Sequence, residues 1–196
     1  MRTLRYAAVL FAAAVGSGCA TAGPKWTPAD GTVAPSSRGY AIRFPRGWLW
    51  LGDRDAVVAS RDGLYLQRID AFQQTVGRPM GGTRKTISMG MLPQEVADVV
   101  QDALVSSPEM QGVTILENAP APLDGHPGFR LEVAYKDRDG LRMRSILCGA
   151  LVGDLLYELS YTAPERHYFD RDLETFEQVR STFKISPAAV ARARTD

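Results

Sequence analysis

The chain has 196 residues, 45% of them hydrophobic, and 23 Lys and Arg residues nearly balance 22 Asp and Glu residues, giving a formal net charge of +1. A chain of this length can bury one sizeable hydrophobic core and is too short to suggest two. Nucleic-acid binding normally needs an excess of basic residues on one face, so the near-neutral balance argues against a nucleic-acid partner.

The first 18 residues have the pattern of a secretory signal peptide. Arg2 and Arg5 form a positively charged start, and ten uncharged, mostly apolar residues follow at positions 6–15. A bilayer-spanning helix takes about 20 apolar residues, so this run is too short to persist as a membrane span. Small residues at positions 16–18 are typical of a peptidase cleavage site. We therefore predict that residues 1–18 are removed as a signal peptide.

The segment VGSGC, residues 15–19, resembles a bacterial lipobox, in which the cysteine sulfur receives a diacylglycerol. It departs from the usual pattern at Gly16, where most bacterial lipoproteins carry an aliphatic residue. The alternative is an ordinary cleaved signal that happens to end beside a cysteine. The resemblance implies an envelope lipoprotein with palmitate-type acyl chains on Cys19. Because Ala20 is not the aspartate that retains many lipoproteins at the inner membrane, it also implies the periplasmic face of the outer membrane.

Residues 19–38 are predicted to form a lipid-anchored tether. Prolines and glycines are spread through this stretch, which has no apolar period, as in flexible linkers. Trp26 is its one large aromatic residue, and it contacts either the membrane interface or the domain. With Cys19 committed to lipid, Cys148 is the only other cysteine, so no intramolecular disulfide is predicted.

A single folded domain is predicted over residues 39–186, and it begins with antiparallel strands. Apolar side chains in residues 40–44 alternate with small or charged ones, which is the period of a strand. The apolar runs 56–60 and 64–69 flank an Asp-Gly pair, a strong signal for a hairpin.

Trp48 and Trp50 stand two residues apart, so on a strand they share one face. Their rings either anchor the core or form an aromatic patch for a partner. We treat both as candidate partner-binding residues.

The connection over residues 71–91 is long for a compact domain and rich in glycine. It is either a mobile loop that binds a partner or a solvated insertion. Its order of residues is not that of a phosphate-binding loop. The candidate partner-binding residues of this loop are its basic side chains, Arg78, Arg84 and Lys85.

Apolar spacing predicts the remaining elements. Pro93 suits the first position of a helix, and apolar residues follow it at spacings of three and four. Later runs alternate with period two, and a last apolar stripe has helical spacing. The predicted elements are a helix from Pro93, strands at 113–117, 129–135, 141–152 and 155–163, a helix at 170–182 and a charged tail at 187–196.

The segment LLYELSYTAP, residues 155–164, the helix that follows it and the triplet 181–183 resemble the carboxy-terminal half of PsbP-like domains. The FPRGW segment, residues 44–48, also resembles the first-strand turn of that superfamily. The resemblance implies an α+β fold, an α/β/α sandwich with a central antiparallel sheet and helices packed on its faces. It implies a binding or assembly module and offers no active site to carry over.

Residues that could carry chemistry are few and scattered. His126 and His167 have no second ligand at metal-binding spacing. Asp137 and Asp139 are spaced like the start of a calcium loop, but the glutamate that would close it is absent, so a hairpin turn is predicted. Cys148 lies inside a predicted strand, which favours a buried thiol. The sequence predicts no metal and no cofactor.

The leading hypothesis is therefore a lipid-anchored cell-envelope lipoprotein, a non-enzymatic module that contacts a protein partner. One alternative is a periplasmic carrier of a small apolar ligand, held between the sheet and the glycine-rich loop. Another is a hydrolase whose site assembles from scattered residues, namely Asp53, Asp55, His126 and His167.

Overall fold

The computed structural model describes residues 25–33, 39–52 and 56–186. The predicted signal peptide, the parts of the predicted tether at 19–24, which include Cys19, and at 34–38, and the tail 187–196 lie outside the described residues. Asp53 and Asp55 lie outside them as well. Neither helix of the described part is long and apolar enough to cross a lipid bilayer.

The described residues form one large antiparallel sheet and one small sheet. The large sheet has eight strands in the order β1-β4-β5-β6-β10-β9-β8-β7, and the small sheet has the order β11-β3-β2. The strands of the large sheet are β1 (Thr27–Pro28), β4 (Leu49–Gly52), β5 (Ala56–Ser60), β6 (Arg68–Thr75), β7 (Gln111–Pro120), β8 (Gly128–Lys136), β9 (Arg142–Val152) and β10 (Leu155–Pro164). Those of the small sheet are β2 (Thr32–Val33), β3 (Tyr40–Arg43) and β11 (Lys184–Ile185).

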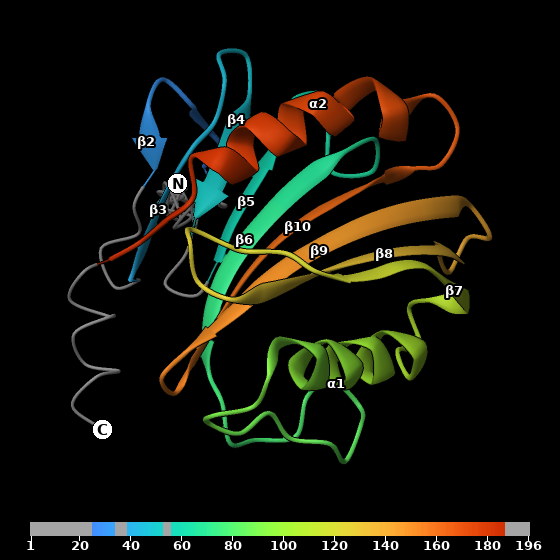
Figure 1. Cartoon of the computed structure of the whole chain (residues 1–196). Helices are drawn as coiled ribbons and strands as arrows, with labels where there is room; N and C mark the ends of the chain where they lie inside the picture. The colour runs from blue at the N-terminus through green and yellow to red at the C-terminus, as the bar shows by residue number, and fades with distance from the viewer. Residues whose placement is uncertain (1–24, 34–38, 53–55, 187–196) are drawn as a thin grey trace, which may run out of the picture.

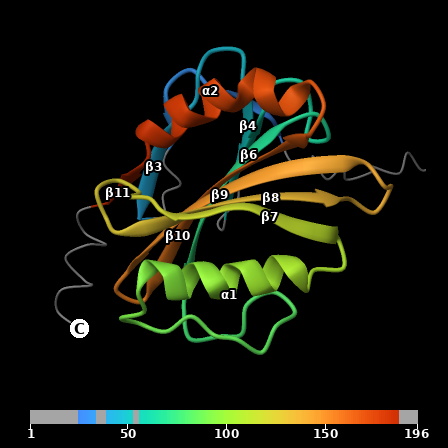
Figure 2. The same cartoon turned by 45° about the vertical axis from the view of Figure 1, so that its right-hand side comes forward.

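Two helices lie on opposite faces of the large sheet, as Figures 1 and 2 show. We call the face covered by α2 (Tyr168–Ser181) the upper face and the face covered by α1 (Pro93–Val105) the lower face. The predicted α/β/α sandwich with a central antiparallel sheet is thereby confirmed.

The upper core is rich in aromatic side chains. Phe169 and Phe176 of α2 are fully buried against Tyr161 of β10. The Tyr161 hydroxyl donates to the backbone carbonyl of Phe169 at 2.9 Å, so its polar tip is satisfied inside the core. This pairing fixes the start of α2 on the central strand.

The lower core is mostly aliphatic, with Phe129 as its one buried aromatic residue among the described ones, and it covers only part of its face. Val96 and Val100 of α1 pack with Leu131 and Val133 of β8 in one buried cluster. The helix begins at Pro93, and the Glu95 carboxylate accepts a hydrogen bond from the Leu92 amide at 2.7 Å, which caps the first turn. The strands beneath α1 are β7, β8 and β9, whereas β6 and β10 lie beyond it.

A buried carboxylate ties α2 to the loop between β5 and β6. The Asp172 side chain is only 1% exposed and forms ion pairs with Arg61 at 3.0 Å and with Arg171 at 2.7 Å. Arg171 also pairs with Asp62 in the same loop. Both oxygens of Asp172 therefore have charged donors, as a buried carboxylate requires.

The structure corrects three expectations in the first half of the chain. Residues 27–33, predicted as tether, contain two short strands, and Ala29 and Val33 are buried in the upper core. Residues 71–75, predicted as connection, belong to β6, because they pair with β10. The predicted strand at 64–69 is also wrong at its start, since the chain does not enter β6 until Arg68. The helices and the last three strands of the large sheet are close to where the sequence predicted them, whereas the strand predicted at 113–117 is longer and forms β7 over Gln111–Pro120.

We expect Asp172→Ala to lower the free energy of unfolding by about 2–3 kcal/mol, because hydrogen bonds from charged donors to a buried carboxylate are lost. Glu174→Ala is the matched control, since Glu174 is exposed on the same helix. Urea unfolding of both variants measures the difference. Equal stabilities would mean that the Asp172 ion pairs do not hold α2 in place.

Candidate functional site

The lower face of β6 and β10 is not covered by a helix. Side chains alternate along both strands, and register places Glu158 opposite Phe72 and Ser160 opposite Asp70. The side chains that share this face differ from the apolar rows on the upper face in being mostly polar. We call them the β6–β10 floor: Arg68, Asp70, Phe72, Gln74, Leu156, Glu158, Ser160 and Thr162.

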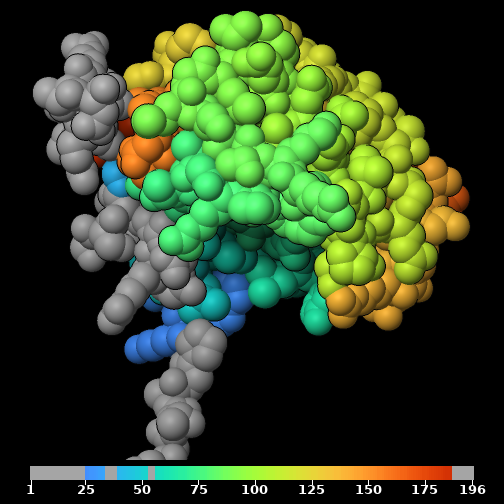
Figure 3. Space-filling model, turned by 90° about the horizontal axis from the view of Figure 1, so that it is seen from below, coloured from blue at the N-terminus to red at the C-terminus, as the bar shows by residue number. Residues whose placement is uncertain are grey.

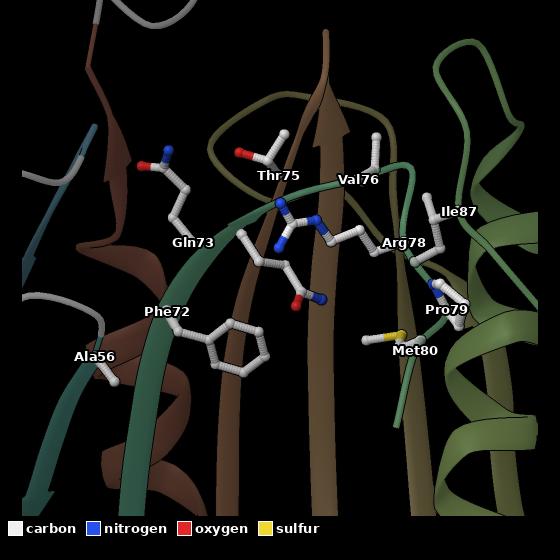
Figure 4. Close-up of a pocket in the computed structure, with 10 residues that line it drawn as sticks. Ala56, Phe72, Gln73, Thr75, Val76, Arg78, Pro79, Met80 and Ile87 are labelled. Carbon is white, nitrogen blue, oxygen red and sulfur yellow. The ribbon is translucent and has the colours of Figure 1, made fainter. Parts of the chain in front are cut away.

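A cavity of about 830 Å³ lies at one end of this floor, beside the loop 76–92. Phe72 lies on one side of it, and Met80 and Ile87 lie on the other, with Arg78 between them (Figure 4). We call it the loop pocket. Figure 3, seen from below, shows the surface hollowed between the loop region, in green, and the blue and teal strands.

The loop 76–92 is folded back on itself as a small hairpin. The Gly77 amide donates to the Ile87 carbonyl at 2.9 Å, and the Met80 amide donates to the Lys85 carbonyl at 3.1 Å. Ile87 is buried against α1, so the loop forms a wall of the pocket as well as a connection. Because this hairpin buries Ile87, the loop is not simply the solvated insertion that was one of the two interpretations of the sequence.

The three basic residues of this loop have different surroundings. Arg78 lines the pocket, whereas Lys85 forms an ion pair with Asp102 of α1. Arg84 is exposed. Their predicted role in partner binding stays a prediction, and Arg78 is the one placed at a cavity.

Glu158 is the most unusual side chain of the floor. It is 4% exposed, and its Oε2 atom has no hydrogen-bond partner among the described residues. Burial, together with the nearby charge of Asp70, raises the pKa of Glu158 to about 8. The carboxyl group therefore keeps its proton in most molecules at neutral pH.

Asp70 is held in a more ordinary way. Its Oδ2 accepts a hydrogen bond from Arg68 Nε at 3.0 Å. Burial raises the pKa of Asp70, and Arg68 and Ser160 act in the opposite direction. Two acidic groups thus lie on adjacent strands of one face, and only Asp70 has a charged partner near it.

The other end of the floor borders a second cavity of about 580 Å³, which we call the tyrosine hollow. Leu64 and Tyr65 of the β5–β6 loop lie at this hollow together with Met110, Leu141 and Met143. Tyr65 is 87% exposed, the largest exposure among the large hydrophobic residues of the described part. Its ring is available to a second molecule.

The two tryptophans are part of the upper core. Trp48 is 2% exposed and stacks on Phe44 at 6.4 Å between ring centroids. Trp50 is partly buried against the same cluster. Trp48 therefore has almost no surface to offer, which corrects its assignment as a partner-binding residue and favours the core interpretation.

The two histidines of the hydrolase hypothesis are not brought together. His167 precedes the first residue of α2, while His126 lies near Asp124, which bonds to Ile185 beyond the other end of that helix. A helix of 14 residues separates its ends by about 20 Å. The two histidines therefore cannot share a substrate. The hydrolase hypothesis no longer has the pair of histidines on which it depended.

Cys148 is 2% exposed on β9, and burial raises the pKa of its thiol to about 11. This agrees with the predicted buried, unreactive cysteine. Across the described ranges, no group of three or more His, Cys, Asp or Glu side chains is arranged to hold a metal ion.

Sequence reasoning missed Glu158 and Tyr65. The signal for Glu158 is a single charged residue in the middle of an otherwise uncharged strand, LLYELSYTAP. The signal for Tyr65 is an aromatic residue next to an Asp-Gly turn, where polar residues are usual. Their burial and exposure depend on packing between distant segments.

No protein-family model matches this chain, and no curated protein sequence matches it. Solved structures do. Cyanobacterial PsbP (CyanoP) from Synechocystis sp. PCC 6803 is similar with a TM-score of 0.53 and 16% identity, over 87% of this chain and 98% of that chain.

Two further structures have comparable similarity. LpqN of Mycobacterium tuberculosis, described as involved in cell envelope biogenesis, has a TM-score of 0.52 and 14% identity, over 83% of this chain and 91% of its own. The Ran-binding protein Mog1p of Saccharomyces cerevisiae has a TM-score of 0.53 and 9% identity, over 85% of this chain and 98% of its own. At these identities the likeness concerns the fold, and the chain has the fold that PsbP and Mog1p share.

Proposed function

We propose that this chain is a lipid-anchored, non-enzymatic module of the cell envelope that binds a protein partner. The observation that carries the proposal is the exposed pair Leu64 and Tyr65, presented by a loop whose backbone is fixed by buried hydrogen bonds. An exposed aromatic side chain on a rigid support is a common feature of protein-binding surfaces.

The β5–β6 loop is fixed from within. The Ser60 hydroxyl donates to the Gln67 carbonyl at 2.8 Å and accepts from the Gly63 amide at 2.9 Å. The Gln67 side chain, fully buried, donates to Asp62 at 3.1 Å. Because Asp62 also pairs with Arg171 of α2, the loop is held by the helix as well. A partner would therefore bind without having to order the loop first.

The surroundings of Tyr65 have the composition of a small interface. Apolar side chains of the tyrosine hollow lie beside the ring, and charged side chains surround them. An apolar centre with a polar rim is the usual arrangement at sites of protein association. The rim residues are Arg68, Glu109, Asp137, Arg138 and Asp139.

A non-enzymatic role is supported by the separation of His126 from His167 and by the burial of Cys148. The fold neighbours lend further support, since Mog1p is described as Ran-binding and LpqN as involved in envelope biogenesis. A binding role for this chain would agree with the descriptions of these two neighbours.

The anchor is proposed from the sequence, because Cys19 lies outside the described residues. Strand β1 begins at Thr27, eight positions after Cys19, and eight residues span at most about 28 Å. A lipid on Cys19 would hold the domain close to the membrane surface. We place it at the periplasmic face of the outer membrane, on the lipobox resemblance and on Ala20.

We expect the parent chain, and not Cys19→Ala, to incorporate a palmitate analogue in cells, because only the thiol can receive the diacylglycerol. Parent protein should enter the detergent phase on phase partitioning, where acyl chains contribute about 0.8 kcal/mol per buried methylene. An exported parent chain in the aqueous phase, with a free thiol at its start, would contradict the anchor.

A photo-crosslinking amino acid at position 65 should give one reproducible adduct in cells, because the ring of Tyr65 is exposed at the proposed interface. The same group at position 174, on the exposed side of α2, is the control and should not give that adduct. Adding Leu64→Ala should reduce the adduct several-fold. Identical adducts from both positions would indicate random collisions and not a binding surface.

A further inference from the structure

We propose that the loop pocket binds a small organic anion, a single carboxylate on a compact apolar body, with its charge at Arg78. The pocket lies at the opposite end of the β6–β10 floor from the tyrosine hollow, so this inference does not depend on the proposed protein partner. It rests on an arginine that has no partner among the described residues, on the apolar side chains around it, and on a hairpin that presents the arginine to the cavity.

Arg78 is the one charged side chain among the described residues that line the pocket. Its guanidinium group forms no ion pair and donates no hydrogen bond within the described part of the chain. By contrast, Arg68 of the floor pairs with Asp70 at 3.0 Å. Lys85 of the same loop pairs with Asp102 of α1. Because a guanidinium group presents a planar fork of donors that matches a carboxylate, the partner that suits Arg78 is a carboxylate of a ligand.

The hairpin of the loop 76–92 restrains the backbone on both sides of Arg78. The Gly77 amide donates to the Ile87 carbonyl at 2.9 Å, and Pro79 forms a β-bridge with Thr86. A residue that precedes proline is also restricted toward extended conformations. The Arg78 side chain extends from this hairpin toward β6 (Figure 4), so a ligand would not have to order the loop before it binds.

The walls of the pocket suit an apolar body. Phe72 lies on one side of the cavity, and Met80 and Ile87 lie on the other (Figure 4). Val76 and Met80 pack against the lower core and stay partly exposed, so apolar surface continues from the core into the cavity. The volume of about 830 Å³ is in the range of small-molecule sites. A ligand that covers this surface is stabilised by apolar burial.

The polar groups of the pocket favour one negative charge and no more. Gln74 lines the pocket on the same face of β6 as Phe72, and its amide group can donate to the carboxylate that Arg78 binds. The acids of the floor do not line the pocket: Asp70 is paired with Arg68, and Glu158 keeps its proton in most molecules at neutral pH. A dianion such as a phosphate monoester would have only one cationic partner here.

Titration calorimetry of the full chain with octanoate tests the proposal, with octanamide as the uncharged ligand and octylammonium as the cation of the same length. We expect octanoate to bind at least tenfold more tightly than either, because only the carboxylate pairs with Arg78. Arg78→Gln should weaken octanoate binding to the level of octanamide. Arg84→Gln is the matched control and should bind as the parent does, since Arg84 is an exposed arginine of the same loop that does not line the pocket.

The apolar walls are tested separately. Butyrate should bind at least tenfold more weakly than octanoate, because its shorter chain leaves most of the walls uncovered. Met80→Ser should weaken octanoate binding several-fold and change butyrate binding little. Tyr65→Ala should bind octanoate as the parent does, which keeps the result separate from that of the proposed protein interface.

Three outcomes would overturn the anion site. The first is the absence of octanoate binding, and the second is an equal affinity for octanoate and octanamide. The third is an unchanged affinity for octanoate in Arg78→Gln. Vesicles made of equal parts of phosphatidylglycerol and phosphatidylcholine distinguish a free carboxylate from a lipid headgroup. If the parent bound these vesicles through Arg78 but bound no octanoate, Arg78 would belong to a membrane-facing surface and the proposal would be wrong.

Discussion

One helix is too narrow to cover one face of an eight-stranded sheet. An α-helix with its side chains is about 10–12 Å wide, and strands lie about 4.8 Å apart, so a helix covers two or three strands. On the lower face α1 covers β7, β8 and β9. On the remaining strands, within the described residues, the lower face is covered only by the loop 76–92 and by the side chains of the strands themselves. The loop pocket lies beside this uncovered part, and the tyrosine hollow extends from it to the ends of β8 and β9.

The upper face solves the same problem in another way. Here α2 shares the cover with the small sheet, and Phe183 and Tyr40 stack at 5.2 Å between ring centroids where the two meet. Asp172 ties α2 to the β5–β6 loop. The upper face is thus closed by aromatic packing and buried ion pairs, while the lower face is open beside α1. A chain with this cover can keep one face for stability and use the other for binding.

Strand β10 contributes to both faces, and this explains what sequence reasoning could and could not predict. Its apolar row, Tyr157, Leu159 and Tyr161, identified the strand and its upper side. Its other row includes Glu158 and Ser160, whose burial by neighbouring segments the sequence did not predict. Local spacing determines which way a side chain points, whereas its burial depends on segments far away in the chain.

The same distinction accounts for the other differences. The helix from Pro93 and the consecutive antiparallel strands β8, β9 and β10 depend on residues close in sequence. The period of apolar residues was therefore sufficient to predict them. Residues 71–75 are a strand because they pair with residues 155–159 of β10, at least 80 positions later. Strands β1 and β2 have two residues each, too short for any period. Residue types alone likewise could not show that Trp48 lies in the core or that His126 and His167 lie far apart in space.

The order of strands also relates the binding sites to the proposed anchor. Strand β1 lies at one edge of the sheet, and β6 is the third strand from it, about 14 Å away at the usual spacing. Strand β1 is the strand nearest to Cys19 in the sequence, and β7 is at the opposite edge of the sheet. The loop pocket, which reaches from Ala56 of β5 to the loop 76–92, therefore lies beside the half of the sheet that contains β1.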